Sequence, residues 1–544
     1  MVETHSLEDW EPLPAERKLA ESVGTGQIVQ IGDGTLPPED LPEDDPRVIR
    51  TGFLRALILG RIKGHTPHEK GVRVRGAYLR GGNPDGEKTH GLDLEGCDLQ
   101  GDIALLACRI PDHLLLRSAS LRNLFLNGSH LASGLSADGL AVSHGIQMRG
   151  LVANGGVRML GARVAGNLEF DAAQLTAKAG LRWALNAEGV SVKGNVFLRS
   201  VVPRSFWIPG QKVGDLHRRF IAHGEVSMSG AWVGGNLDCS GAQLTAISDG
   251  DALGLQSVRV EGVFQLSNET RVVGVLDMVA ARLENLADDL ASWPPDGKLV
   301  LDRCCYGAFV GKGTPVDARS RIRWLSLQDE RRWGQDFWPQ PWEECARVLR
   351  AMGHEADARA VLIEKEKRQR RARRDRLRRE HLYEDAAWFS FWDALMGITT
   401  RYGRQPLLAF AWLAGLILLG LGVFEGARNA EALKPNDSIA LRSAEWVDCV
   451  PGAERYSGEG SQLACFLEQP EGRGYPAFNP LVYSADALLP IFDLGMQEYW
   501  VADENTGFGQ GARVYLWVHI TLGWALSLLA VAGFSGLIRT DNTT

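Results

Sequence analysis

An eleven-residue repeat is the feature of this chain that most restricts its fold. Residues 155–176 divide into two blocks, GGVRMLGARVA and GNLEFDAAQLT, that align without a gap, and the same register returns at 224–245. Each block reads apolar-x-apolar, then a glycine-containing corner, then small-x-apolar. Because residues two apart on an extended chain point to the same side, every block directs its apolar positions into one interior. A fixed period of this kind is typical of a solenoid.

The repeat can be followed from residue 71 to residue 286, and two blocks are predicted to form one coil. Small residues such as Ala162 and Ala173 recur at one corner, and glycines such as Gly161 supply the backbone freedom that the corner needs. About ten coils at a strand spacing of ~4.8 Å give a stack roughly 45–50 Å long. The inward positions carry almost no charge, so we expect the interior to be core and the function to lie elsewhere.

Two insertions interrupt the period, at 81–90 and at roughly 199–223. The longer one mixes aromatic and basic residues, and it is predicted either to pack on the edge of the stack or to bind a protein partner through Phe206, Trp207, His217, Arg218 and Arg219. The ends of such a stack expose unpaired strands and are normally capped. An apolar helix at 48–62 is predicted to cap the first end, and the irregular segment 287–335 the second.

Two segments are long and apolar enough to cross a bilayer. The first runs from Leu407 to Phe424 without a charge, and the second runs from Val514 to Ile538 with His519 as its one titratable group. Between them, residues 425–511 hold five Lys or Arg and fourteen Asp or Glu, whereas arginines flank the spans on the opposite side. The positive-inside rule therefore predicts that both termini are cytoplasmic and that the loop lies outside.

The outer loop contains two further signals. Cys449 and Cys465 lie alone on the oxidising side, which predicts a disulfide between them, with two free thiols as the alternative. Residues 478–500 are too few and too polar to span, and indicate a short helix that is either re-entrant or packed at the interface. In the first case Asp486 and Asp493 are candidates for the mouth of a cation pore, and in the second they belong to an interfacial helix packed on the spans. His519, in the second span, is a candidate for the pore as a proton relay, or it contacts the interface or a neighbouring helix.

A strongly basic helix is predicted ahead of the first span. Residues 339–364 favour an αα-hairpin of tetratricopeptide type as a structural link, followed by EKEKRQRRARRDRLRR and then by the aromatic stretch WFSFWDAL. Cations beside interfacial aromatic residues gain roughly 1 kcal/mol each near an anionic leaflet. We favour lipid headgroups over a solvated helix or nucleic acid as the interpretation of Arg370, Arg371, Arg373, Arg374, Arg378 and Arg379. The net charge of −8 also argues against a polyanion-binding protein overall.

Together with WPQPWEECARVLRAMGH and TTRYGRQPL, these segments make the chain resemble a family of bacterial membrane proteins with a pentapeptide-like solenoid and two C-terminal spans. The resemblance covers most of the chain and implies the bacterial inner membrane. Members often carry the label membrane-associated oxidoreductase. The residues supply no motif for that activity, because GTGQIVQIGDG lacks the third glycine of the dinucleotide fingerprint and no haem, flavin or iron–sulfur motif occurs. We therefore expect no cofactor, no metal and no catalytic residue.

The expected chain is multidomain, with a right-handed parallel β-solenoid, an α-helical hairpin and a two-span membrane domain. The predicted parts are a helical cap at 1–70, the solenoid at 71–286, an irregular cap at 287–335, the hairpin and basic helix at 336–381, an interfacial helix at 382–405, a span at 406–425, the periplasmic loop at 426–511 and a second span at 512–539. The leading hypothesis is a membrane-anchored, homo-oligomeric scaffold that binds anionic lipids and an unidentified protein. Its alternatives are an oligomeric channel or transporter gated by the solenoid, and a redox enzyme.

Overall fold

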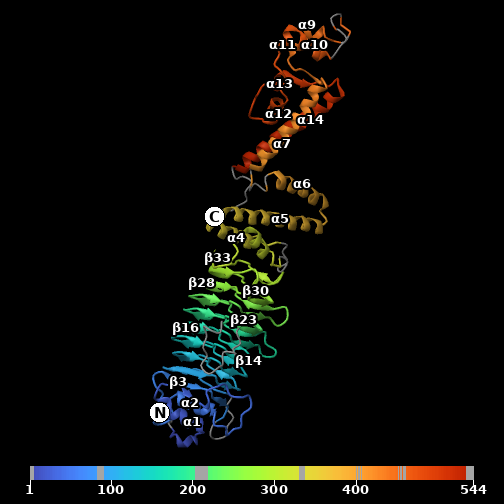
Figure 1. Ribbon diagram of the computed structural model, residues 1–544. Coiled ribbons are helices and arrows are strands. Elements are labelled where there is room, and N and C mark those ends of the chain that lie inside the picture. Colours follow the sequence, from blue (N-terminus) through green and yellow to red (C-terminus); the bar gives the residue numbers. More distant parts are fainter. Residues whose placement is uncertain are drawn as a thin grey trace. The chain divides into compact units, whose positions relative to one another are not determined.

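The protein divides into two compact units, residues 1–365 and residues 366–544. The computed structural model (Figure 1) describes residues 5–82, 91–201, 219–329, 337–399, 401, 405, 407–450, 452–453, 456 and 461–534. The first unit consists mainly of short parallel strands, and the second mainly of helices. Each unit is held together by its own contacts, so the fold has at least two separate cores.

Within the described residues, the first unit contains three parallel sheets of 16, nine and eight strands. The largest contains β1 (Val29–Gln30), β3 (Gly71–Arg75), β5 (Asp102–Leu106), β8 (Ser120–Leu121), β9 (Leu124–Phe125), β12 (Ala141–Val142), β13 (Ile146–Gln147), β16 (Arg163–Val164), β17 (Leu168–Glu169), β20 (Ser191–Val192), β21 (Val196–Phe197), β24 (Trp232–Val233), β25 (Leu237–Asp238), β28 (Arg259–Leu266), β31 (Arg282–Asp288) and β33 (Cys305–Phe309). The nine-stranded sheet contains β2 (Val48–Arg50), β4 (Tyr78–Arg80), β6 (Arg109–Ile110), β10 (His130–Leu131), β14 (Val152–Asn154), β18 (Gln174–Thr176), β22 (Ile221–His223), β26 (Gln243–Thr245) and β29 (Arg271–Val273). The third contains β7 (Leu114–Leu115), β11 (Leu135–Ser136), β15 (Val157–Arg158), β19 (Trp183–Asn186), β23 (Glu225–Ser227), β27 (Asp251–Gly254), β30 (Val275–Asp277) and β32 (Leu299–Val300).

The chain visits these sheets in a fixed order. From β7 to β10 one strand joins the eight-stranded sheet, two join the largest sheet and one joins the nine-stranded sheet, and β11 to β14 repeat the sequence of visits. In the middle of the unit, paired residues in successive strands of a sheet are 22 apart, as in Leu135 with Val157 and Ile146 with Leu168, and the separation grows where the chain has insertions, as in Val157 with Leu185. The separation of 22 equals two of the eleven-residue blocks.

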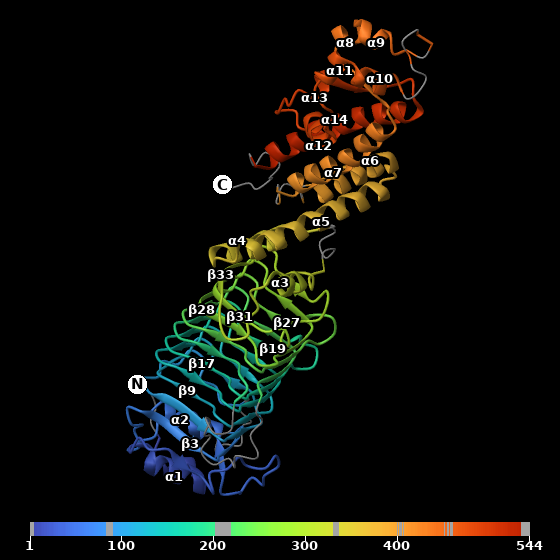
Figure 2. The ribbon, with the colours of Figure 1, turned by 45° about the horizontal axis from the view of Figure 1, so that its top comes forward.

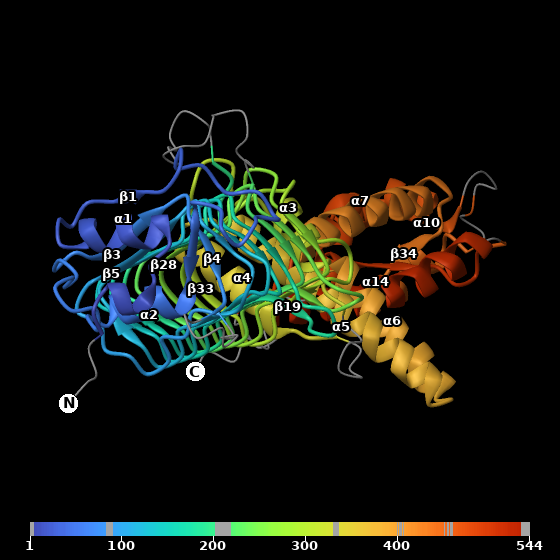
Figure 3. The ribbon, with the colours of Figure 1, turned by 90° about the horizontal axis from the view of Figure 1, so that it is seen from below.

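Figure 3 shows the strands of the first unit arranged around a common interior. The buried side chains of these strands are mostly apolar. Leu135, Val157 and Leu185 pair in successive strands of the eight-stranded sheet, and all three are buried. Ala162, at the corner between two strands, is also fully buried, so a larger side chain has no room there. Gly161 precedes it with a φ of 61°, a conformation that glycine adopts at little cost.

The first end of the stack differs from the sequence-based expectation. Residues 48–62 were expected to be one helix, but the structure has β2 followed by α2 (Thr51–Ile58). Val48 and Ile49 pair in parallel with Tyr78 and Leu79, because the open strand edge offers hydrogen-bonding partners that a helix does not use. A short 3-10 helix (Glu8–Trp10) and α1 (Pro14–Val23) complete this end.

The second end is also more regular than expected. The segment 287–335, predicted to be irregular, holds β32, β33 and α3 (Ala318–Leu325), followed by α4 (Gln340–Ala351) (Figure 2). The eleven-residue spacing is lost here, yet Leu299 still pairs with Leu276 and Cys305 with Arg282. The exposed strand edges select these pairings, and a search for period alone cannot find them.

The second unit is built on long helices. α5 (Glu355–Arg379) runs into it from the first unit and is followed by α6 (Tyr383–Thr399), α7 (Leu407–Asn429) and, near the end of the chain, α14 (Gly507–Phe534). Between α7 and α14 lie β34 (Leu433–Pro435), α8 (Ser438–Arg442), α9 (Ala444–Val447), α10 (Gln462–Glu468), α11 (Pro470–Arg473), α12 (Pro480–Leu488), α13 (Met496–Tyr499) and β35 (Trp500–Ala502), with β34 antiparallel to β35. α12 packs against both α7 and α14.

A partly buried histidine on the nine-stranded sheet makes the stability of the first unit depend on pH. Burial, and secondarily the charge of Arg109, lower the pKa of His130 below its usual value. The folded state favours the neutral ring, so the unfolded state binds a proton more readily. The free energy of unfolding therefore falls as the pH drops through and below the unfolded pKa of about 6.5. We expect the stability difference between the wild type and His130→Asn to change between pH 7.5 and pH 5.5, measured by urea unfolding. A difference that stays constant over this range contradicts the prediction.

Candidate functional site

Part of the basic run is used to hold α5 against α6. The guanidinium of Arg374 forms an ion pair with the buried carboxylate of Asp393, and Arg370 lies 3.6 Å from the same group. The guanidinium of Arg373 lies over the ring of Phe389 at 4.7 Å from its centroid. Arg371, Arg373, Arg378 and Arg379 are exposed, whereas Arg370 and Arg374 are half-buried. The predicted lipid-facing set is therefore divided between structural and exposed side chains.

Three large aromatic side chains of α6 form an exposed cluster. The ring centroids of Trp388, Phe391 and Trp392 lie 5.7 to 6.1 Å apart, and their exposed fractions are 64%, 59% and 40%. Surface aromatic clusters of this kind mark binding to membranes or to other proteins. Tyr and Trp rings are favoured at the level of lipid headgroups, where one part of the ring stays apolar and another contacts water.

Two of the described helices are long and apolar enough to span a membrane, Leu407–Asn429 (α7) and Gly507–Ala532 within α14. In the most apolar 18-residue stretch of each helix, only 22% (α7) and 28% (α14) is buried inside the protein. The exposed positions include large apolar side chains on both helices, namely Phe410, Trp412, Leu418, Leu419, Trp517, Val518, Leu522, Trp524 and Leu528. An apolar surface of this extent is unfavourable in water and suits a lipid environment.

Three polar side chains of α12 and α14, Ser484, Tyr515 and His519, lie within hydrogen-bond distance of one another. His519 Nε2 lies 3.2 Å from Ser484 Oγ, and its Nδ1 lies 3.1 Å from the hydroxyl of Tyr515. Ser484 also donates to the carbonyl oxygen of Ile417 on α7. Ser484 and His519 are almost fully buried, so this chain of hydrogen bonds connects α7, α12 and α14.

The two carboxylates predicted for a pore or an interface have local partners. Asp486 accepts hydrogen bonds from the backbone N–H groups of Leu494 and Gln497, and thereby fixes the turn that follows α12. Asp493 accepts from the N–H of Gly495 and is exposed. The buried Asp486 thus has a structural role that both of its oxygens serve.

Cys449 and Cys465 lie at disulfide distance, with Cα atoms 5.7 Å apart and a sequence separation of 16. Closing a loop of this length stabilises the folded state by ~3 kcal/mol in the chain-entropy account. We therefore expect reduction to increase the rate at which a protease cuts between residues 430 and 500. A variant with both cysteines changed to alanine serves as control, because its cleavage should not respond to reductant. Alkylation of both thiols in the unreduced folded protein contradicts the pairing.

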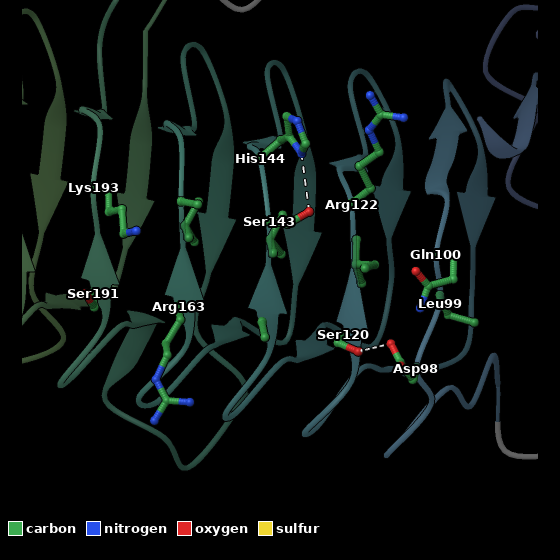
Figure 4. Close-up of a pocket in the computed structure, with 15 residues that line it drawn as sticks. Asp98, Leu99, Gln100, Ser120, Arg122, Ser143, His144, Arg163, Ser191 and Lys193 are labelled. Atoms are coloured by element: carbon green, nitrogen blue, oxygen red, sulfur yellow. Dashed lines mark hydrogen bonds between the residues drawn. The ribbon is translucent and has the colours of Figure 1, made fainter. Parts of the chain in front are cut away.

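A shallow groove of about 500 Å³ crosses the largest sheet of the first unit (Figure 4). Its lining includes the small residues Ala141 and Ala165 and the cations Arg122, Arg163 and Lys193. The other polar lining residues are Asp98, Gln100, Ser120, Ser143, His144 and Ser191. Asp98 is bonded to the hydroxyl of Ser120, and Ser143 lies 3.2 Å from His144 Nδ1. The basic side chains are therefore the groups best able to meet a ligand.

The sequence analysis did not find this groove. Its lining residues lie at outward positions of successive strands, so that Ser120, Ala141, Arg163 and Ser191 form one row of parallel partners. A table of outward residues in the eleven-residue register would have shown small and basic side chains gathering on one face.

Most of the candidate partner loop lies outside the described residues. Four of its five predicted contact residues, Phe206, Trp207, His217 and Arg218, are in that part. Arg219 is described, is half-buried and lies 3.8 Å from the carboxylate of Glu269. Among the described residues, no group of three or more His, Cys, Asp or Glu side chains is placed to hold a metal ion. No protein-family model, curated protein or solved structure matches the chain.

Proposed function

We propose that this chain is a bacterial inner-membrane protein that presents a β-solenoid as a non-catalytic binding platform. In this proposal the three parallel sheets of the first unit are the faces of a right-handed, pentapeptide-like solenoid. Support comes from partners that recur at 22 residues and from the buried apolar ladders between the sheets. An interior of this kind holds no room for a substrate, so the outer faces carry the binding function.

The observation that carries the proposal is the exposed aromatic cluster of α6 beside the exposed arginines of α5, immediately ahead of an apolar helix. Trp388, Phe391 and Trp392 supply the interfacial anchor, and Arg371, Arg373 and Arg378 supply positive charge for anionic headgroups. α7 and α14 then cross the bilayer, with α12 packed between them. The charge contrast across these helices supports cytoplasmic termini and an outer loop.

A spin label tests the headgroup contact directly. With Cys305 changed to serine, a nitroxide at Trp392→Cys in liposomes of zwitterionic and anionic lipid should be more accessible to oxygen than to a water-soluble nickel complex. A nitroxide at Thr25→Cys, in the first unit, should show the opposite preference. Equal preference at both positions would leave α6 in water and contradict the proposed anchor.

Cysteine labelling tests the topology. A membrane-impermeant maleimide should label Ser438→Cys in intact spheroplasts, and should label Thr25→Cys only after permeabilisation. The reverse pattern would place the platform outside the cell.

A native pull-down from membranes, with measured stoichiometry, tests the expected homo-oligomer and identifies the protein partner.

The channel alternative receives less support. Acidic side chains that attract cations at a pore mouth need free oxygens, and both oxygens of Asp486 accept backbone hydrogen bonds. We therefore assign α12 to the packing of the two apolar helices.

A further inference from the structure

The groove on the largest sheet concentrates positive charge that the protein itself does not neutralise. Within the described part of the chain, no carboxylate forms an ion pair with Arg122, Arg163 or Lys193, and all three are exposed. Several other arginines of the same unit are paired with carboxylates, namely Arg73 with Asp102, Arg117 with Glu95, Arg149 with Glu169, Arg158 with Asp138, Arg182 with Glu225, Arg199 with Asp171 and Arg259 with Glu261. Arg271 and Arg282 are exposed and form no ion pair with a described residue, but they do not line the groove. An overall acidic protein has thus left these three cations available for a ligand.

The cations are spaced along the direction in which the strands stack. Arg122 and Lys193 each follow a buried residue of one ladder, Leu121 and Val192, and these residues are separated by three strand pairings. At ~4.8 Å for each pairing, the two side chains start ~14 Å apart along the groove. Arg163 lies in the neighbouring row of residues, two pairings from Ser120, and Figure 4 shows its side chain directed away from that of Arg122.

We propose that this groove binds an extended acidic peptide segment, with carboxylates at alternate positions. Alternate side chains of an extended strand lie ~6.8 Å apart, so three of them cover ~14 Å and match the cationic track. The small side chains of Ala141 and Ala165, which lie in the same rows as the cations, let a backbone approach the sheet closely. The hydroxyls of Ser143 and Ser191 offer hydrogen bonds to peptide groups along the same path.

The lining favours a peptide over a nucleic acid. Single-stranded nucleic acids bind through aromatic platforms on which the bases stack, and no Phe, Tyr or Trp is among the described residues that line the groove. Asp98 lies at one end of the groove and repels any negative charge placed beside it. A nucleic acid carries a charge at every residue and cannot avoid this repulsion, whereas a peptide can place an uncharged residue beside Asp98. The site therefore suits a segment of alternating rather than continuous charge.

Binding of a labelled peptide to the full chain in detergent micelles tests the proposal. The probe is a fluorescent nine-residue peptide with glutamate at three alternate positions and threonine between them. Its anisotropy should report saturable binding that weakens as salt is raised. The variant Arg122→Gln, Arg163→Gln, Lys193→Gln should bind it about tenfold more weakly or worse, and the same peptide with glutamine for glutamate should not bind.

A second triple variant serves as the control, because it removes three positive charges that lie outside the groove. Arg271→Gln, Arg282→Gln, Lys312→Gln changes three exposed cations of the same unit and should retain binding within about twofold of the wild type. Equal losses in both variants, equal binding of the glutamine peptide, or tighter binding of a short oligothymidine through the same cations would each overturn the proposal. The outcome does not depend on the topology or headgroup experiments, which involve other residues.

Discussion

Changing Asp288 to alanine is expected to destabilise the first unit by about 3–5 kcal/mol. Asp288 and Arg321 are both buried and form a bidentate ion pair with N–O distances of 2.7 and 2.8 Å. Arg321 also donates to the carbonyl oxygen of Pro315, and its guanidinium lies 3.6 Å from the ring centroid of Phe309. Removal of the carboxylate leaves a buried cation without its counter-charge. Urea unfolding of the full chain, followed by pulse proteolysis of the first unit, measures the loss.

Two controls separate this effect from charge removal in general. Glu95→Ala removes one partner of the exposed pair between Glu95 and Arg117, and should cost less than ~1 kcal/mol. The double variant Asp288→Leu, Arg321→Leu should recover part of the loss, because it leaves neither charge buried alone. If Asp288→Ala lowers the free energy of unfolding no more than Glu95→Ala does, the ion pair between Asp288 and Arg321 is not buried away from water, and the prediction is wrong.

This ion pair also shows where sequence reasoning ends. The repeat predicted which residues between 71 and 286 point inward, because one period-2 pattern within an eleven-residue block specifies both face and corner. Asp288 and Arg321 lie beyond the last block, and their pairing depends on where α3 meets β31. No local pattern encodes that meeting, so a segment that looked irregular contains a buried network.

The candidate sites divide in the same way. Composition and length were enough to predict the two apolar helices and the basic helix, and the isolation of two cysteines in the loop between the apolar helices was enough to suggest their pairing. The partners of Asp393, Asp486 and His519 could not be predicted, since each is satisfied by a group whose position depends on tertiary packing. The groove was missed because its cations belong to different turns of the repeat.

Replacing Gly523 by alanine is expected to lower the thermal stability of the second unit in detergent by about 5–10 °C. A Cβ atom at Gly523 would lie 1.9 Å from the carbonyl oxygen of Leu488, at the end of α12, and a backbone atom cannot move aside as a long side chain can. Overpacking of this kind costs about 1–3 kcal/mol, and each kcal/mol shifts the midpoint by roughly 2–4 °C in a unit of this size. Size-exclusion chromatography after heating gives the midpoint.

Gly511→Ala is the matched control, because it lies on the same helix with no neighbouring atom within 4 Å of the added Cβ. Both changes raise helix propensity by about 1 kcal/mol, so the difference between them isolates the contact with α12. Gly511→Ala should therefore be neutral or slightly stabilising. Equal midpoints for the two variants would mean that α12 does not pack on α14, and would contradict the assignment of α12 to the packing of the two apolar helices.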